Sequence, residues 1–166
     1  MCRLDAYHAD DYAEVLEMLQ DHINYAPEYG GLEAEENDRQ YFEENFSNGS
    51  AGGNAYILMG DDKHIISFMT CEKIPTECDR FRWYVTNLFV RKNMESDKTA
   101  KRAIDLFSEE ISENESLSIN VNSEFKEIIS FWRESGFKIS PDRSVFQNAD
   151  NEILIALTKE ITGLSS

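Results

Sequence analysis

The spacing of hydrophobic residues changes several times along the chain, and each change marks a different element of secondary structure. Apolar residues that recur every three or four positions predict amphipathic helices with one buried face. The segment Glu33–Phe46 is also expected to be helical, but few of its positions are apolar and many are acidic, so this helix should lie at the surface. The expected helices are Asp10–Ile23, Glu33–Phe46, a helix that opens from the turn Arg91–Thr99 and ends near Glu113, and Ser123–Ser135.

Shorter apolar runs bounded by Gly, Pro, Asn and Asp predict β-strands. The runs on either side of Gly60-Asp61-Asp62-Lys63 should form an antiparallel hairpin, because that tetrapeptide is rich in turn residues. The elements follow one another as a strand, two helices, three antiparallel strands, a helix, a strand, a helix and further strands, which predicts an α/β (α+β) fold with a mixed sheet. The expected strands are Cys2–Tyr7, Ala55–Met59, His64–Cys71, Phe81–Val90, Leu117–Val121, Phe137–Ile139, Ser144–Gln147 and Glu152–Thr158.

Three segments have the composition of loops. Pro27 and Gly30-Gly31 should end the first helix and make a loop of Asn24–Leu32. Ser47–Asn54 is rich in Gly and Ser, and Glu72–Arg80 contains Pro75. With 166 residues and no internal repeat, the chain is expected to form a single domain over residues 1–166.

Charge and hydrophobicity exclude several classes of function. The formal net charge is −16, which repels nucleic acid and anionic membranes over most of the surface. The same charge would attract cationic molecules, although acidic excess is also a common device for solubility. No apolar run approaches the roughly 20 residues that span a bilayer, and the N-terminus has no basic region followed by an apolar stretch, so we expect a soluble, cytoplasmic protein.

Cysteine and histidine usage argues against a metal site. The three cysteines have no CxxC spacing, so neither a disulfide framework nor a zinc site is indicated. Cys71 ends an apolar strand-like run, where a packing role is favoured over a nucleophile. The histidines His8, His22 and His64 are scattered without partners at ligand spacing, and no metal is expected.

Residues 85–137 carry the most specific pattern in the chain. The strand Val85–Val90 (VTNLFV) leads through a polar turn into a helix, then a second strand, a second helix and Gly136-Phe137. The first turn of a helix has backbone N–H groups without intrahelical partners and the positive end of the helix dipole, a combination that attracts a pyrophosphate. Ser96 is a candidate N-cap for this helix.

This arrangement resembles the GNAT N-acetyltransferase superfamily, which binds acetyl-CoA at such a strand–turn–helix unit. The second half of that family's pattern, VxxxNxxAxxxYxxxGF, fits in spacing from Val121 to Gly136-Phe137. The family's turn pattern, (R/Q)xxGx(G/A), covers Glu95–Ala100 and matches at its last position. Different residues stand at the family's other signature positions, namely Glu95, Lys98, Phe125, Ile128 and Trp132.

The resemblance implies a mostly antiparallel central sheet flanked by helices and acetyl-CoA as co-substrate. Backbone groups of Leu88, Phe89 and Val90 would pair with the pantetheine arm, where two strands splay apart. The pyrophosphate would meet the backbone amides of Lys98, Thr99, Ala100 and Lys101, with the charges of Lys98 and Lys101 adding to binding.

The catalytic groups are less clearly marked. Tyr84 and Asn87 on the central strand are candidates for handling the amine, and Asn87 could position a water. Trp132 stands where the family commonly has a general-acid Tyr, and an indole N–H cannot take that role at neutral pH. A buried core aromatic is the plainer interpretation of Trp132.

Two functions therefore stay open. The first is transfer of an acetyl group from acetyl-CoA to a small-molecule or peptide primary amine, which the acidic surface suggests is cationic. The second is a GNAT-fold binding or regulatory domain that has lost catalysis, an alternative motivated by Glu95, Lys98, Phe125 and Trp132 at four of the signature positions. Oligomeric state is also open, although an edge strand such as Glu152–Thr158 could pair across a homodimer.

Overall fold

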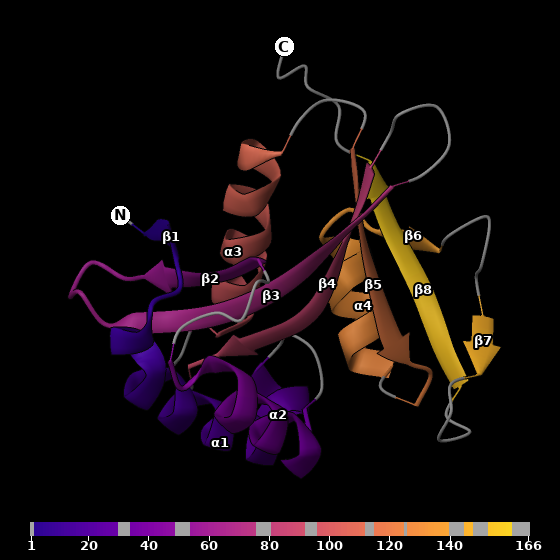
Figure 1. The fold of residues 1–166 in the computed structure, drawn as a ribbon. Coiled ribbons are helices and arrows are strands. Elements are labelled where there is room, and N and C mark those ends of the chain that lie inside the picture. Colours follow the sequence, from indigo (N-terminus) through magenta and orange to yellow (C-terminus); the bar gives the residue numbers. More distant parts are fainter. Residues whose placement is uncertain are drawn as a thin grey trace.

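A computed structural model gives the fold (Figure 1), and it describes residues 2–29, 34–48, 54–75, 81–91, 96–111, 115–124, 126–139, 145–147 and 153–160. The helices are α1 (Tyr12–Tyr29), α2 (Glu36–Phe46), α3 (Ser96–Glu110) and α4 (Lys126–Glu134), with a short 3-10 turn at Ala9–Asp11. The strands are β1 (Arg3–Ala6), β2 (Asn54–Met59), β3 (Ile65–Pro75), β4 (Phe81–Val90), β5 (Ser116–Asn122), β6 (Lys138–Ile139), β7 (Val145–Gln147) and β8 (Ile153–Glu160).

The strands form one sheet in the order β1-β2-β3-β4-β5-β8-β6, with β7 also paired to β8. Neighbouring strands are antiparallel except β4 and β5, which run parallel. The expected mixed, mostly antiparallel sheet is therefore confirmed. The predicted hairpin is also confirmed, since β2 and β3 pair through the turn after Met59.

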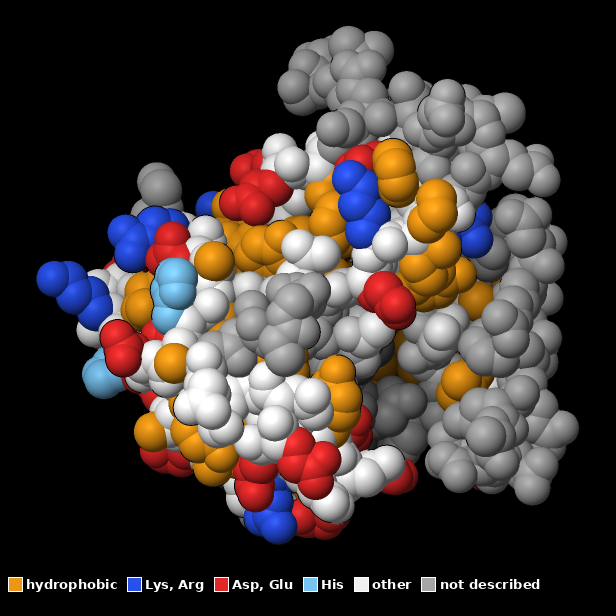
Figure 2. Space-filling view, in the orientation of Figure 1, with side chains coloured by type: hydrophobic (Ala, Val, Ile, Leu, Met, Phe, Trp, Pro, Cys, Tyr) orange, Lys and Arg blue, Asp and Glu red, His pale blue; other side chains and the backbone are white. Residues whose placement is uncertain are grey.

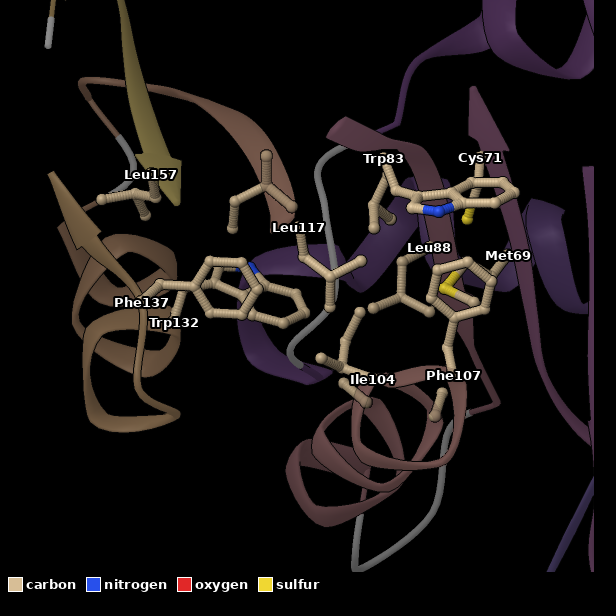
Figure 3. Packing of buried hydrophobic residues seen from close by; sticks show 14 of the residues in the cluster. Met69, Cys71, Trp83, Leu88, Ile104, Phe107, Leu117, Trp132, Phe137 and Leu157 are labelled. Carbon is tan, nitrogen blue, oxygen red and sulfur yellow. The ribbon is translucent and has the colours of Figure 1, made fainter. Parts of the chain in front are cut away.

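Helices cover both faces of this sheet, and each face has its own core. On one face, α1 and α2 pack against the sheet through an aromatic cluster that includes Phe42, Phe46, Phe68 and Phe89. On the other face, α3 and α4 supply Ile104, Phe107, Ile128 and Trp132 to a larger core. Figure 3 shows Ile104 and Phe107 directed at Leu88 and Met69 of the sheet, and Trp132 lying beside Phe137.

Two helix boundaries differ from the sequence expectation. The first helix continues to Tyr29 and includes Pro27, where a break was expected. Pro27 lacks the amide that would donate to the carbonyl four residues earlier, so the helix continues through it with one internal hydrogen bond fewer, and this loss falls in the last turn rather than at the centre of the helix. The second helix begins at Glu36 rather than Glu33, because the Glu35 amide donates to the Asp38 carboxylate at 2.8 Å and closes the first turn there.

The third helix is described from Ser96 to Glu110. The residues before it, 92–95, lie outside the described residues, so Ser96 as its N-cap stays a prediction. The expected exposed loop Glu72–Arg80 is shorter than predicted, because β3 continues through Pro75 and pairs there with Phe81. Proline is compatible with a strand end, where its missing amide breaks no interior pair.

The last strand lies inside the sheet rather than at its edge. Strand β8 pairs with β5 on one side, and with β6 and β7 at its two ends on the other. A homodimer formed through a free edge of Glu152–Thr158 is therefore not supported, since the strand's hydrogen-bonding groups already have partners. The prediction failed because the sequence indicates both short segments as extended but does not show that they pair with β8.

Candidate functional site

The parallel strands β4 and β5 separate along their length. They pair only at Arg82–Ser116, Trp83–Leu117 and Tyr84–Ser118, and no further pair joins them within residues 81–91 and 115–124. Figure 1 shows the two strands crossing close together at one end and diverging toward their C-terminal ends. The backbone of β4 after Tyr84 therefore has no strand partner on this side.

The backbone groups that face this opening belong to Leu88 and Val90. The amide of Arg91 donates to the Ile66 carbonyl on β3 at 2.9 Å. Because backbone groups alternate in direction along a strand, the groups of Phe89 also face β3, while those of Leu88 and Val90 face the opposite side. We call the backbone groups of Leu88 and Val90 on that side the β4 edge.

A histidine from α1 already contacts this edge. The amide of Val90 donates to Nδ1 of His22 at 3.2 Å, and the His22 ring lies 5.3 Å from the ring of Phe89. His22 is completely buried. A nitrogen that accepts a hydrogen bond carries no proton, so this contact requires an imidazole with Nδ1 deprotonated.

The start of α3 combines buried and charged positions. Thr99 and Ala100 are buried against the sheet, whereas Lys98 and Lys101 are exposed. Lys98 lies in the first turn, at the positive end of the helix dipole, and Lys101 lies one turn later. Two cationic side chains are thus presented to solvent at the helix start, and the turn at 92–95 lies outside the described residues.

A cavity of about 610 Å³ lies on the α2 side of the sheet. Its lining includes Thr70 of β3 and two consecutive residues of β4, Thr86 and Asn87. Consecutive side chains of a regular strand point to opposite faces, but here the register shifts between Thr70 and Cys71, which leaves Thr86 as an extra residue in β4. This β-bulge explains why both side chains reach one cavity, which we call the bulge cavity.

The side chains at the bulge are joined by short hydrogen bonds. Asn87 Nδ2 donates to Thr70 Oγ1 at 2.9 Å, and the hydroxyls of Thr70 and Thr86 lie 2.6 Å apart. Thr86 Oγ1 in turn donates to the backbone carbonyl of Thr70 at 3.1 Å. Of the two residues predicted to handle the amine, Asn87 lines this cavity, whereas Tyr84 is not among its described lining.

Charged and aromatic groups surround the polar centre of the bulge cavity. Asp38 and Tyr41 of α2 and Glu72 of β3 line it, together with Lys73. The ammonium of Lys73 lies 3.4 Å from the Glu115 carboxylate and 4.3 Å from the centroid of the Phe81 ring. Its charge is thus partly balanced by Glu115.

Two residues considered for chemistry have structural roles. Cys71 is buried, and burial raises the pKa of its thiol to about 12, so the thiol stays protonated and is a poor nucleophile. Trp132 is fully buried between Phe131 and Phe137, with ring centroids at 5.0 and 5.3 Å. The predicted packing roles of both residues are confirmed.

A second cavity, of about 780 Å³, lies along α1 and α2 and reaches Arg91. Arg91 follows β4 directly, donates to the Ile65 carbonyl at 2.7 Å and contacts the Glu14 carboxylate at 3.2 Å. Glu14 also accepts the amide of Ile65 at 2.6 Å. This network ties the ends of β3 and β4 to α1 and holds the β4 edge beside His22.

The sequence analysis considered His22 only as a metal ligand and gave no role to Thr70 or Thr86. For His22 a signal was present, because it follows Leu19 by three positions and Val15 by seven on the apolar side of α1. A histidine at such a position is buried and needs a hydrogen-bond partner. No comparable signal marks the threonines, whose contact depends on the bulge.

Among the described residues, no three His, Cys, Asp or Glu side chains are grouped so that they could hold a metal ion. Within the same part of the chain, no helix combines the length and apolar character needed to cross a bilayer.

Comparison with known proteins shows similarity in structure rather than in sequence. No protein-family model and no curated relative matches the chain. The aminoglycoside 6'-N-acetyltransferase from Enterococcus faecium superposes with a TM-score of 0.63 at 14% identity, covering 99% of both chains. A GNAT-family acetyltransferase from Bacillus cereus superposes with a TM-score of 0.60 at 13% identity, covering 96% of this chain and 97% of that chain.

A third similar structure is the NatC complex bound to Gag peptide and CoA, with a TM-score of 0.58 and 13% identity over 97% of this chain and 99% of that chain. Likeness at such low identity shows the fold. The chain has the GNAT fold, as the pattern over residues 85–137 indicated.

Proposed function

We propose that this protein is an N-acetyltransferase that moves an acetyl group from acetyl-CoA to a primary amine by direct transfer. The eight strands of the sheet belong to one layer, which supports a single acyltransferase domain over residues 1–166. The observation that carries the proposal is the separation of β4 from β5 after Tyr84, which leaves the β4 edge open to an extended ligand.

The residues present fit an amide-containing arm followed by a pyrophosphate. Backbone carbonyl and amide groups of Leu88 and Val90 can pair with such an arm as a neighbouring strand would. The side chains of Lys98 and Lys101 stand at the start of α3, where a pyrophosphate would meet positive charge and the helix dipole. Thr99 and Ala100 would contribute only backbone groups, since their side chains are buried.

Acetyl-CoA supplies an activated acetyl group, and the protein's contribution is to bind, orient and exclude water. The acceptor, which is protonated in solution, first gives one proton to solvent; its nitrogen would then form a bond to the acetyl carbon as the carbon–sulfur bond breaks, and the second proton lost by the nitrogen would pass through solvent to the departing thiolate. A thiol with an ordinary pKa of about 8.5 leaves without strong assistance, so the buried Trp132 need not supply a proton. Asn87 lines the bulge cavity, and in this proposal it would orient the amine there.

A cationic amine suits the surroundings of the bulge cavity. Figure 2 shows acidic side chains gathered over α1 and α2 on the face that carries both helices. The exposed carboxylates of α2 include Glu36, Glu43 and Glu44, and the net charge of the chain is −16. Such a field raises the local concentration of cations and their rate of association. The acceptor is proposed to be a small-molecule or peptide amine that is protonated in solution.

One observation favours the second candidate, a GNAT-fold domain without catalysis. The Val90 amide, which would pair with the arm, already donates to His22. A ligand at the β4 edge must either displace His22 or do without this amide. If neither occurs, the fold serves binding or regulation by another ligand.

Isothermal titration of the purified protein with acetyl-CoA at low and moderate salt tests the proposal. Micromolar binding that weakens with salt is expected, because the pyrophosphate would contact Lys98 and Lys101. The variant Lys101→Gln should reduce both the affinity and its salt dependence, and Lys63→Gln in the β2–β3 turn is the matched control. Absence of binding in the wild-type protein would favour the non-catalytic domain.

The double variant Glu95→Arg, Lys98→Gly restores two signature residues of the family. Gain of acetyl-CoA binding in this variant would identify a decayed cofactor site. Loss of binding would instead identify Lys98 as part of a repurposed site in which its ammonium binds phosphate directly.

A further inference from the structure

The hydrogen bonds at the bulge have a fixed direction. Each threonine hydroxyl has one proton to donate. Thr86 Oγ1 donates its proton to the Thr70 carbonyl, which can only accept. The Thr70 hydroxyl must therefore donate to Thr86 Oγ1 across the 2.6 Å contact. This leaves Thr70 Oγ1 as an acceptor for the Asn87 amide.

This direction fixes the orientation of the Asn87 carboxamide. With Nδ2 held 2.9 Å from Thr70 Oγ1, Oδ1 is turned away from the two threonines. The reversed carboxamide would place Oδ1 against an oxygen whose proton is already donated to Thr86, so two acceptors would face each other. Within the described residues Oδ1 has no protein partner, and Asn87 is partly exposed where it lines the cavity.

From this geometry we infer that Thr70 and Thr86 are positioning residues, which hold Asn87 so that Oδ1 accepts an N–H group of a primary ammonium or amine in the bulge cavity. The inference deepens the proposed acetyltransfer and rests on it for the catalytic purpose of the site. It adds one requirement to the proposed amine acceptor: the ligand must donate a hydrogen bond from nitrogen to Asn87, which a cation without N–H groups does not do.

The rest of the cavity agrees with such a ligand. Phe46 and Tyr41 of α2 give it an aromatic side, and Tyr41 is 55% exposed, so its ring is accessible to a ligand. Asp38 and Glu72 contribute negative charge to the lining, while the Lys73 ammonium lies 3.4 Å from the Glu115 carboxylate. A short alkyl stem can contact the rings while the ammonium reaches Asn87.

The inference can be tested by amine binding alone, without acetyl-CoA. The probe is n-butylammonium chloride, titrated into the ¹⁵N-labelled protein while the side-chain NH₂ signals of Asn87 are followed by NMR. The comparison ligand is N,N,N-trimethylbutylammonium, which has the same charge and stem but no N–H. We expect n-butylammonium to shift the Asn87 signals and to bind about tenfold or more tightly than the trimethyl compound, as is typical for one charged hydrogen bond.

The positioning role is tested with threonine variants. Thr86→Val keeps the shape but removes the hydroxyl, so it should change the Asn87 signals and lower the affinity for n-butylammonium toward that of Asn87→Ala. Thr86→Ser keeps the hydroxyl and should restore both. The backbone amide spectrum of each variant checks that the fold is retained.

Two results would overturn the inference. One is equal binding of the two cations, or no response of the Asn87 signals to n-butylammonium. The other is a folded Thr86→Val variant with unchanged Asn87 signals and affinity. Because acetyl-CoA is absent, these outcomes are independent of the calorimetric test, and a protein that binds the amine but not acetyl-CoA would refute only the proposed transfer.

Discussion

Replacement of His22 by Leu should weaken the fold but strengthen cofactor binding. His22 is fully buried and accepts the Val90 amide at 3.2 Å, and Leu fills a similar volume without an acceptor. The Val90 amide then loses its partner inside the protein. An unsatisfied buried donor costs about 1–3 kcal/mol, and the free energy of unfolding should fall by roughly this amount.

The free energy lost from folding should be regained when acetyl-CoA binds, because the ligand can accept the Val90 amide. In the wild-type protein, an arm that pairs with Val90 must exchange one acceptor for another. In His22→Leu the arm supplies an acceptor that the amide lacks, so binding should gain about 1–3 kcal/mol, or roughly 5- to 150-fold in affinity. Titration calorimetry gives the affinity, and denaturant unfolding with and without acetyl-CoA gives the stability.

A control separates this effect from general loosening of the fold. Leu19→Ala removes another fully buried side chain of α1 and should cost about 2–5 kcal/mol of stability, while the His22–Val90 contact stays intact. Its affinity for acetyl-CoA should equal that of the wild-type protein. Equal or weaker binding by His22→Leu would refute the competition argument. Binding by His22→Leu alone would show that His22 closes the β4 edge in the wild-type protein.

Three further predictions concern buried groups. Trp132→Ala should lower the free energy of unfolding by about 3–5 kcal/mol, and the exposed neighbour Arg133→Ala should change it by less than about 0.5 kcal/mol, both measured by urea unfolding. Iodoacetamide at pH 8 should modify Cys2 far faster than Cys71, whose pKa is raised to about 12 by burial; peptide mass spectrometry checks this, and equal rates would contradict the burial of Cys71. Burial also raises the pKa of Tyr7 to about 12, with smaller effects of nearby charges. As the pH rises, the Tyr7 hydroxyl and the Cys71 thiol therefore lose their protons at a lower pH in the unfolded chain than in the folded protein. The stability linked to these two groups is complete below pH 9.0, the ordinary value for the thiol, and should be lost progressively toward about pH 12, as alkaline urea titrations would show.

The sequence predicted those parts of the fold that depend on local periodicity. Helix α3 has a regular apolar face that includes Ala100, Ile104 and Phe107, and it forms where expected because that face must be buried. The predicted ends of elements at Pro27 and Pro75 were wrong, since α1 and β3 continue through these residues. A proline removes one backbone amide donor, and whether a helix or strand tolerates the loss of that hydrogen bond depends on the position of the proline in the folded structure.

The site is harder to predict because its parts depend on register, which no local pattern contains. The backbone groups of Leu88 and Val90 face the opening because the Arg91 amide pairs with the carbonyl of Ile66, which lies on another strand. The pair Thr86 and Asn87 reaches one cavity only because β4 carries one residue more than β3 at the bulge. A sequence shows consecutive polar residues in a strand and predicts opposite faces for them. In the structure both side chains lie on a common face. Their hydrogen bonds with Thr70 then fix the orientation of the Asn87 carboxamide, so that its Oδ1 is directed away from the threonines and can accept a hydrogen bond. A change that shifts the register by one residue would therefore remove the site while leaving every predicted helix in place.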